Sequence, residues 1–252
     1  MRTLIFVSTL AVCAIATPAL AEEGDWTGPY VGVHAGYTGA KSQSDVTLGG
    51  SWSVETQSLR DEVTAAWSPK QSVNDMNFGA QIGYNYDMSG AVLGLEADIS
   101  ALRGKKVSSR GPIATTTYPT LSYTYGNTID PKHMISLQAR VGATMGDTLL
   151  YAHGGWAWTK AEMAAEIVSN GGYTKEGRID KTLNGYIVGA GIEQRFGANV
   201  SARLEYSYTD QGDETYATGY RTGSTFTSPV YSESVTQDLR MHLVRVGLNY
   251  RF

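Results

Sequence analysis

The sequence predicts an all-β fold, an eight-stranded antiparallel up-and-down barrel formed by residues 22–252. Eight segments alternate apolar residues with small or polar residues at every second position, which is the period of a β-strand. The seven connections between these segments alternate between long and short. The chain is also rich in glycine (29) and tyrosine (16), and no stretch after Ala21 has the length and apolarity of a membrane-spanning helix. These observations favour strands throughout the chain.

Residues 1–21 have the features of a secretory signal peptide. Arg2 provides a short positive region, residues 4–16 are mostly apolar, and Ala19-Leu20-Ala21 is an A-x-A cleavage site. The apolar run is shorter than the roughly 20 residues that a spanning helix needs, which argues against a retained anchor. We therefore expect export of the chain and a mature protein that begins at Glu22.

Cysteine content and charge narrow the possibilities further. Cys13 is the only cysteine and lies inside the predicted signal peptide, so the mature chain cannot form disulfides. Its stability must come from another source, and a closed, hydrogen-bonded barrel is one. The formal net charge of −4 gives no indication of nucleic-acid binding.

The eight predicted strands follow one another with one apolar face each. In the first, Val31, Val33 and Ala35 share a face, while Gly32 and His34 lie on the other. The first four strands run from about 30, and over 77–87, 93–100 and 135–144. The last four run over 150–158, 186–196, 200–208 and 244–252. Each has about the length of a tilted transmembrane strand.

The connections fall into two classes. Three are tight turns: Asp87-Met88-Ser89-Gly90, Gly146-Asp147 and Gly197-Ala198-Asn199. Four are long and polar: 41–75, 103–132, 161–181 and 211–238. This alternation is typical of a transmembrane β-barrel with short periplasmic turns and four long extracellular loops, and a soluble sandwich gives no reason for it. Extended motifs in 41–54 and 216–231 leave open a taller barrel wall without further membrane strands.

Aromatic residues are expected to form two girdles at the membrane interfaces. With both termini periplasmic, the lower girdle contains Tyr84, Tyr86, Phe196, Tyr250 and Phe252. The upper girdle contains Tyr37, Phe78, Trp156, Trp158, Tyr186, Tyr206 and Tyr208. The two-level grouping independently supports the predicted strand directions.

The second face of the strands carries the charges and must point into the barrel. A basic residue that faced lipid at mid-depth would cost about 2–4 kcal/mol, whereas inside the barrel it can pair with a carboxylate on a nearby strand. We predict a lumen ion-pair network of Glu96, Asp98, Arg140, Glu193, Arg203, Glu205 and Arg245. Glycines on the same face leave room for the arginines. Because eight strands enclose only enough space for side chains, we expect a plugged lumen.

Three stretches resemble a known family. They are Trp26-Thr27-Gly28-Pro29-Tyr30-Val31-Gly32, Gly94-Leu95-Glu96-Ala97-Asp98, and the closing Arg245-Val246-Gly247-Leu248-Asn249-Tyr250-Arg251-Phe252. Across about 24–252 the chain resembles the small alphaproteobacterial outer-membrane immunogenic proteins, often labelled porin-family or outer-membrane β-barrel domain proteins. The resemblance implies a Gram-negative outer-membrane surface antigen that supports envelope integrity. Relatives include haemin-binding barrels, and the porin label does not imply a wide lumen.

Catalytic and metal sites have weak support. None of the histidines, His34, His133, His153 and His242, stands in an H-x-S arrangement or has metal-ligand spacing. His153 with Thr159 and Glu162 is a loose alternative, and the carboxylates Glu96 and Asp98 fit an ion-pair role better. We expect no enzyme activity, catalytic residue, cofactor or metal. Six loop tyrosines either extend the hairpins or stack on sugars or haem: Tyr118, Tyr123, Tyr125, Tyr216, Tyr220 and Tyr231.

The functional expectation is a barrel for envelope integrity and surface interaction. The alternatives are a narrow porin-like channel for small solutes or ions, and a surface receptor for haemin or a similar ligand. Expected partners are outer-membrane lipid and lipopolysaccharide, host or extracellular ligands at the loops, and the barrel-assembly machinery. Phe252 is the predicted C-terminal assembly signal, because it ends a strand whose apolar face contains Val244, Val246 and Leu248.

Overall fold

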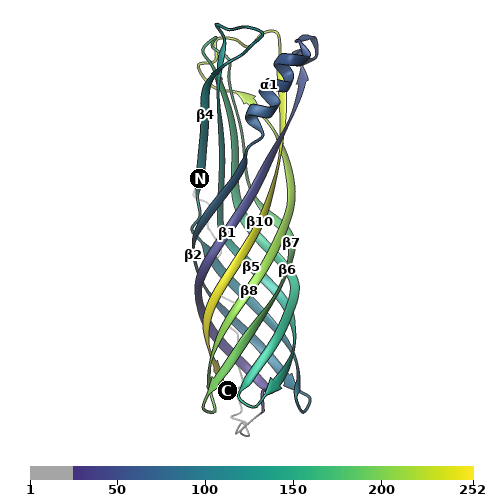
Figure 1. Cartoon of the computed structure of the whole chain (residues 1–252), viewed down its shortest axis with the longest axis vertical. Coiled ribbons are helices and arrows are strands. Elements are labelled where there is room, and N and C mark those ends of the chain that lie inside the picture. The colour runs from purple at the N-terminus through teal and green to yellow at the C-terminus, as the bar shows by residue number, and fades with distance from the viewer. Residues whose placement is uncertain (1–24) are drawn as a thin grey trace, which may run out of the picture.

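Eight strands close into one antiparallel ring in the computed structural model, which describes residues 25–252 (Figure 1). They are β1 (Gly28–Gly50), β2 (Lys70–Asp87), β3 (Ala91–Leu102), β5 (Ser122–Met145), β6 (Thr148–Ser169), β7 (Thr174–Phe196), β8 (Val200–Ala217) and β10 (Tyr231–Arg251). Each pairs with its neighbours along the chain, and β10 pairs with β1 from Tyr30↔Arg251 upward, which removes both sheet edges. The predicted eight-stranded up-and-down barrel is confirmed. The predicted signal peptide, 1–21, lies outside the described residues.

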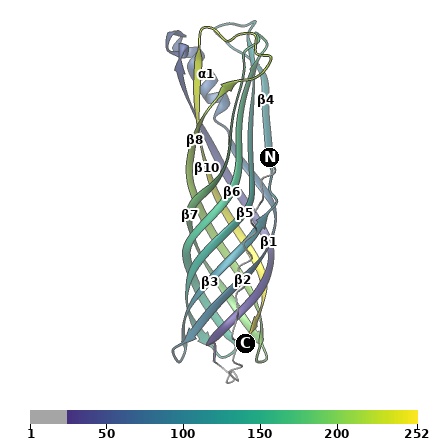
Figure 2. The ribbon, with the colours of Figure 1, turned by 180° about the vertical axis from the view of Figure 1, so that it is seen from behind.

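Four smaller elements lie toward the upper end. β4 (Lys106–Ala114) pairs with the upper part of β5, above the point where β3 ends, and β9 (Gly219–Tyr220) pairs with β7. The 3-10 helix η1 (Ser51–Val54) and the helix α1 (Gln57–Trp67) connect β1 to β2. Figures 1 and 2 show α1 against the top of the barrel from opposite sides.

Helix α1 begins and packs for local reasons. The Thr56 hydroxyl accepts a hydrogen bond from the backbone N–H of Leu59 (3.3 Å), which is an N-cap. Leu59, Val63 and Trp67 follow at four-residue spacing, so they share one face, and all three are buried. This face anchors the helix to the barrel.

The three lower turns lie where the sequence places them. They connect β2 to β3, β5 to β6 and β7 to β8. Gly146 and Gly197 have φ values of 62° and 82°, in the left-handed region that a residue with a Cβ rarely adopts. Both termini of the described chain lie at this lower end, as expected.

The strands differ from expectation in their length. β1 has 23 residues and β5 has 24, about twice the 9–11 that a tilted strand needs to cross a bilayer. Most residues of the four predicted connections therefore continue the barrel wall; between β6 and β7, for example, only 170–173 lie outside strands. We call the four segments 41–75, 103–132, 161–181 and 211–238 together the head.

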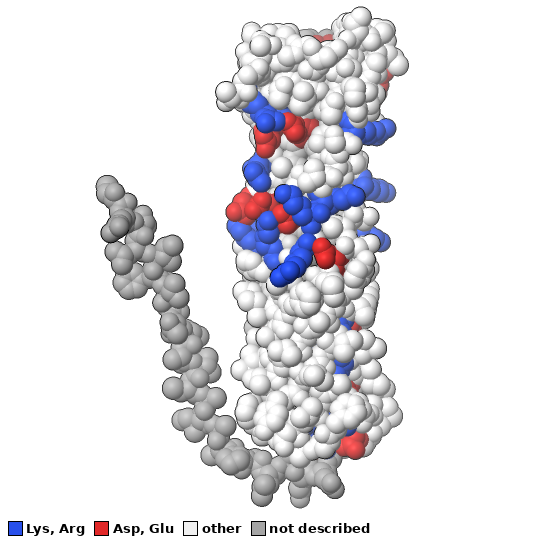
Figure 3. Space-filling model, turned by 90° about the vertical axis from the view of Figure 1, so that its left-hand side faces the viewer, with Lys and Arg blue, Asp and Glu red and all other residues white. Residues whose placement is uncertain are grey.

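A change in side-chain polarity explains why the head resembled loops. In the lower part of β10, Val244, Val246 and Leu248 point outward and are exposed. From Met241 upward into the head, Met241, Leu239 and Val235 point inward and are fully buried, while polar residues face outward. The alternation of a strand continues, but the apolar face is now the inner one. The barrel residues outside the four head segments form a region that we call the lower belt. Figure 3 shows charged side chains gathered above this belt, which is almost free of them on its outer surface.

The aromatic residues predicted for the two girdles lie on the outside of the lower belt. Tyr84, Phe196 and Tyr250 are exposed near the lower turns, and Tyr37 and Trp156 are exposed near its upper border. Within residues 25–252, none of the helices is long and apolar enough to cross a bilayer.

Candidate functional site

The structure brings the seven residues of the predicted lumen network together inside the lower belt. Arg140 on β5 donates to Glu193 on β7 (Nη2 to Oε2, 2.8 Å) and lies 3.5 Å from Glu96 on β3. Arg203 on β8 reaches Glu96 across the lumen (Nη1 to Oε2, 2.6 Å). All four side chains are at most 2% exposed, so the pairs are shielded from solvent.

Arg245 on β10 joins opposite walls of the barrel. Its guanidinium is fully buried and pairs with Asp98 on β3 (Nη1 to Oδ1, 3.2 Å) and with Glu205 on β8. It also contacts the hydroxyls of Ser100 (3.4 Å) and Ser207 (3.3 Å). One side chain therefore spans the lumen between two carboxylates.

Two tyrosines complete the network, and sequence reasoning did not assign them to it. The Tyr30 hydroxyl donates to Glu96 (2.7 Å), and the Tyr151 hydroxyl donates to Glu205 (2.8 Å). The Arg140 guanidinium lies over both rings, 5.5 Å from the Tyr30 centroid and 4.0 Å from that of Tyr151. The sequence did contain one indication of this role, because Tyr151 stands at an inward-facing position of its predicted strand. A cation over an aromatic ring stabilises the buried charge further.

The lumen also contains two groups that resemble the elements of a hydrolase site. His34 lies 3.1 Å from the Ser100 hydroxyl (Nε2 to Oγ) and 3.3 Å from Asp98 (Nδ1 to Oδ2). His153 lies 3.4 Å from the Ser207 hydroxyl and 3.9 Å from Glu205. The serines stand two strands away from the histidines, which is why a local motif did not reveal them.

Burial limits the chemistry of these two His–Ser–carboxylate groups, because a substrate would have to reach the serine hydroxyls. Both histidines are at most 6% exposed, and Arg245 contacts both serines, so the serine hydroxyls face the lumen network. Thr159 and Glu162 are not among the hydrogen-bond partners or ion pairs of His153 within the described chain. Among residues 25–252, no three His, Cys, Asp or Glu side chains converge to hold a metal.

A second plug closes the lower end of the lumen. Trp26, just before β1, is fully buried. The guanidinium groups of Arg195 and Arg251 lie 5.2 Å and 4.7 Å from its ring, and Arg251 also donates to the backbone carbonyl of Asp25 (3.2 Å). The segment before the first strand therefore folds into the mouth of the barrel.

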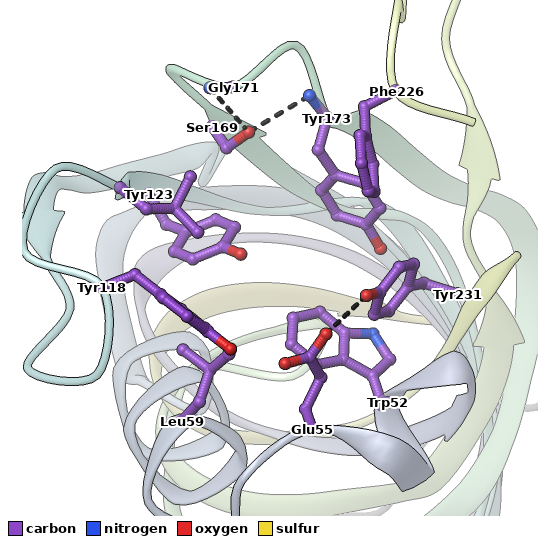
Figure 4. A pocket seen from close by; sticks show the side chains of 11 residues that line it. Trp52, Glu55, Leu59, Tyr118, Tyr123, Ser169, Gly171, Tyr173, Phe226 and Tyr231 are labelled. Carbon is purple, nitrogen blue, oxygen red and sulfur yellow. Dashed lines mark hydrogen bonds between the residues drawn. The ribbon is translucent and has the colours of Figure 1, made fainter. Parts of the chain in front are cut away.

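The inside of the head is filled by apolar side chains and ends in an open aromatic pocket of about 210 Å³ (Figure 4). The pocket is lined by Trp52, Glu55, Leu59, Tyr118, Leu121, Tyr123, Ser169, Gly171, Tyr173, Phe226 and Tyr231. All four head segments contribute to this lining. We call this feature the head pocket.

A buried ion pair lies beside the aromatic rings of the head pocket. Glu233 pairs with Lys175 (2.7 Å) and accepts hydrogen bonds from the indole of Trp52 (2.6 Å) and the hydroxyl of Tyr173. Burial acts to raise the pKa of Glu233, but the hydrogen bonds from Lys175, Thr218, Trp52 and Tyr173 outweigh it and hold the pKa below its ordinary value. Glu233 therefore stays ionised and holds the aromatic side chains in place.

The comparisons with known proteins agree with this architecture. The family model described as "Outer membrane protein beta-barrel domain" matches residues 7–252. The chain belongs to this family. The 31 kDa outer-membrane immunogenic protein of Brucella melitensis is 28% identical over 94% of this chain and 88% of its own length. The 25 kDa outer-membrane immunogenic protein of Brucella abortus is 26% identical over 92% and 82%.

Among solved structures, the outer membrane protease OmpT from Escherichia coli is similar to this barrel in fold. The TM-score is 0.51 at 10% identity, over 94% of this chain and 100% of OmpT, and this likeness shows the fold alone.

Family membership and the Brucella relatives place the protein in the Gram-negative outer membrane. The predicted resemblance to outer-membrane immunogenic proteins is confirmed.

The six loop tyrosines of this outer-membrane barrel have different positions. Tyr118, Tyr123 and Tyr231 line the head pocket, and Tyr220 lies 5.8 Å from Tyr173, centroid to centroid. Tyr125 and Tyr216 are buried inside the head. Five of them lie on strands of the head and Tyr118 lies in the turn between β4 and β5; three of the six line a pocket that sequence spacing did not reveal.

Phe252 lies at the seam between the last strand and the first. Its backbone N–H donates to the Pro29 carbonyl (3.1 Å), and its ring packs edge-on against Tyr250 at 5.2 Å. Both rings face outward in the lower girdle of the outer-membrane barrel. The role of Phe252 as an assembly signal stays a prediction.

Proposed function

We propose that this outer-membrane protein is a closed barrel that supports envelope integrity and presents a ligand-binding head at the cell surface. The observation that carries the proposal is Arg245, which is fully buried and joins Asp98 on one wall to Glu205 on the other. A conducting path would have to pass this side chain, and eight strands leave little space around it.

The apolar side chains inside the head also argue that the barrel is closed to ions. Above the lumen network, fully buried side chains such as Ile129, Ile167 and Val235 occupy the interior of the head. Hydrated ions pay a large desolvation cost in apolar surroundings, so this region is a second barrier to conduction. The alternative of a narrow channel therefore needs both barriers to open.

The proposal does not include enzyme activity. The two His–Ser–carboxylate groups are occupied by Arg245 and buried, so a substrate has no access to either serine. The relatives from Brucella are named immunogenic proteins, and the protease likeness is a likeness of fold.

Lipid contacts follow from the outer surface. The lower belt offers apolar side chains to acyl chains, and basic residues such as Lys132, Lys160 and Arg240 lie above it. We propose that these residues contact the phosphates of lipopolysaccharide. The head would then be the part available to host or other extracellular ligands, and Phe252 the contact for the assembly machinery.

Single-channel recording in planar lipid bilayers tests the closed barrel. We expect no stable conductance steps from the refolded chain; brief small flickers are compatible with occasional passage of ions through a hydrated polar network. The variant Arg245→Ala removes the bridging side chain, and we expect more frequent flickers from it. Steady conductance of the unsubstituted chain, comparable to that of a sixteen-stranded porin, would overturn the proposal.

A further inference from the structure

The head pocket combines aromatic walls with a carboxylate that has no cation. Within residues 25–252, Glu55 forms no ion pair, and its recorded partner is the Tyr231 hydroxyl, which donates to Oε1 (2.5 Å). Glu55 is half-buried at the end of η1, and Figure 4 shows it between Tyr118 and Tyr123 on one side and Tyr173 and Tyr231 on the other. The pocket therefore offers a negative charge surrounded by ring faces and edges.

The rings form a box and not a flat platform. Trp52 and Tyr231 meet at 75° with centroids 4.9 Å apart, and Trp52 and Tyr173 meet at 90° and 6.3 Å. Phe226 packs at 66° against Tyr173. A sugar ring or a haem plane stacks on one broad face, whereas neighbouring rings at steep angles surround a compact, rounded group.

Several polar groups of the pocket are already engaged within the protein, while the hydroxyls of Tyr118 and Tyr123 form no recorded hydrogen bond among residues 25–252. The Ser169 hydroxyl accepts hydrogen bonds from the backbone N–H groups of Gly171 (3.2 Å) and Tyr173 (3.1 Å). The hydroxyls of Tyr173 and Tyr231 donate to Glu233 and Glu55. A sugar needs several unengaged donors and acceptors, and this lining offers two phenol hydroxyls beside one carboxylate, so it suits better a ligand that brings charge and apolar surface but few hydroxyls.

The head itself contains an example of such recognition. The ammonium group of Lys175 lies 4.7 Å from the Tyr220 centroid and 6.0 Å from that of Tyr173, and Glu233 neutralises it. Glu55 repeats this arrangement of rings and carboxylate, but with the position of the cation open to the outside. Burial and the charges of Glu55 and Glu233 also raise the pKa of Tyr123 to about 12, consistent with a negative electrostatic field here.

We infer that the head pocket binds a compact organic cation, of the quaternary ammonium class that includes choline and tetramethylammonium, with Glu55 as its counter-ion. Aromatic boxes recognise this class because methyl groups carrying positive charge bind to ring faces. Pockets for drug-sized ligands measure about 300–1,000 Å³, so the smaller volume here fits a trimethylammonium group and excludes a complete haem. The inference rests on the proposed surface-binding role and names its ligand class.

Titration calorimetry of the full refolded chain tests the inference, in a detergent without a quaternary ammonium group. The probes are choline, tetramethylammonium and 3,3-dimethylbutan-1-ol, the neutral isostere of choline. We expect both cations to bind and the neutral isostere to bind at least tenfold more weakly. Equal binding of choline and its isostere, no binding of either cation, or binding of haemin alone would overturn the inference.

Variants locate the site independently of the probes. Glu55→Gln should weaken choline binding at least tenfold, whereas Glu214→Gln, on the outside of the wall, should leave it unchanged. Tyr231→Phe keeps the ring and should bind within a fewfold of the unsubstituted chain, but Tyr231→Ala should not. Unchanged binding in Glu55→Gln would refute the role of this carboxylate. Bilayer conductance tests the closed-barrel proposal, and calorimetry tests cation binding. A failure of either claim can therefore be told apart from a failure of the other.

Discussion

Seven of the eight barrel strands continue from the lower belt into the head, where β4 pairs with β5 above the end of β3, yet the interiors of the two regions are opposite in character. In the belt, Arg140, Arg203 and Arg245 lie inside and apolar residues face outward. In the head, residues such as Ile167 and Val235 lie inside, and ion pairs such as Lys181 with Glu214 lie on the outer surface. The strand period is the same in both regions, so the medium outside decides which face is apolar.

The comparison shows that backbone closure and side-chain core are separate sources of stability. In the belt, lipid surrounds an unbroken set of backbone hydrogen bonds, and the interior must neutralise its own charges. In the head, water surrounds the wall, and burial of apolar side chains stabilises the interior as in a soluble protein. Each region should therefore respond to a different kind of substitution.

The largest effect is expected from Arg140→Ala in the belt. This change leaves Glu193 and Glu96 without one of their cations in a buried site, and loss of one partner of a buried pair costs about 3–5 kcal/mol. The folded barrel should lose its heat-resistant gel mobility at a lower temperature. Arg110→Ala, an exposed arginine of β4, is the matched control and should leave that temperature unchanged. Equal unfolding temperatures for the two variants would contradict the role of the lumen network.

A second substitution should affect the head and leave the belt intact. Trp52 is 2% exposed and packs against Tyr173 and Tyr231, and removal of such a ring costs about 3–5 kcal/mol. Trp52→Ala should make the head sensitive to added protease, while the heat-resistant gel mobility of the barrel remains. If the substitution abolishes both the protease resistance of the head and the heat-resistant gel mobility of the barrel, the two regions are one cooperative unit and the comparison is wrong.

The pH dependence should also differ in the head, because hydrogen bonds hold the pKa of Glu233 below its ordinary value. The unfolded head then binds a proton at a higher pH than the folded head does. The stabilisation from Glu233 is complete above the ordinary carboxyl pKa of about 4.3 and is lost as the pH falls through the lower folded value.

Limited proteolysis of the head between pH 7 and pH 3 measures this effect. The unsubstituted chain should become more sensitive toward the acid end. Glu233→Gln should show a smaller change with pH and a head that is less stable at pH 7. The same slope in both chains would mean that another group titrates.

The smallest effect is expected from an ion pair on the outer surface of the head. Lys181 lies 2.7 Å from Glu214, but its side chain is 56% exposed, and exposed pairs contribute about 0–1 kcal/mol. Lys181→Met should therefore leave the denaturant midpoint nearly unchanged. A shift as large as that of Arg140→Ala would show that charge pairing outside the wall matters as much as pairing inside it.

The sequence predicted the belt far better than the head for a physical reason. Val244 and Val246 follow the lipid-facing pattern, and the interior charges could be assigned because no charge is stable in lipid. Above Leu243 the apolar face turns inward, so the same alternation no longer marks a membrane strand. The head pocket was beyond prediction because Trp52, Tyr118 and Phe226 come from three segments that only the closed barrel brings together.

The position of Arg245 on β10 has a consequence for the order of events during folding. The carboxylates of Asp98 and Glu205 belong to β3 and β8, so both are synthesised before their shared cation. Until the last strand pairs with the first, these carboxylates lack the Arg245 cation and depend on their other partners, such as Ser100 for Asp98 and Tyr151 for Glu205. Closure of the seam and neutralisation of these carboxylates by Arg245 therefore happen in the same step. A half-closed barrel is consequently an intermediate with unbalanced charge in its lumen, and the final strand supplies the cation that balances it.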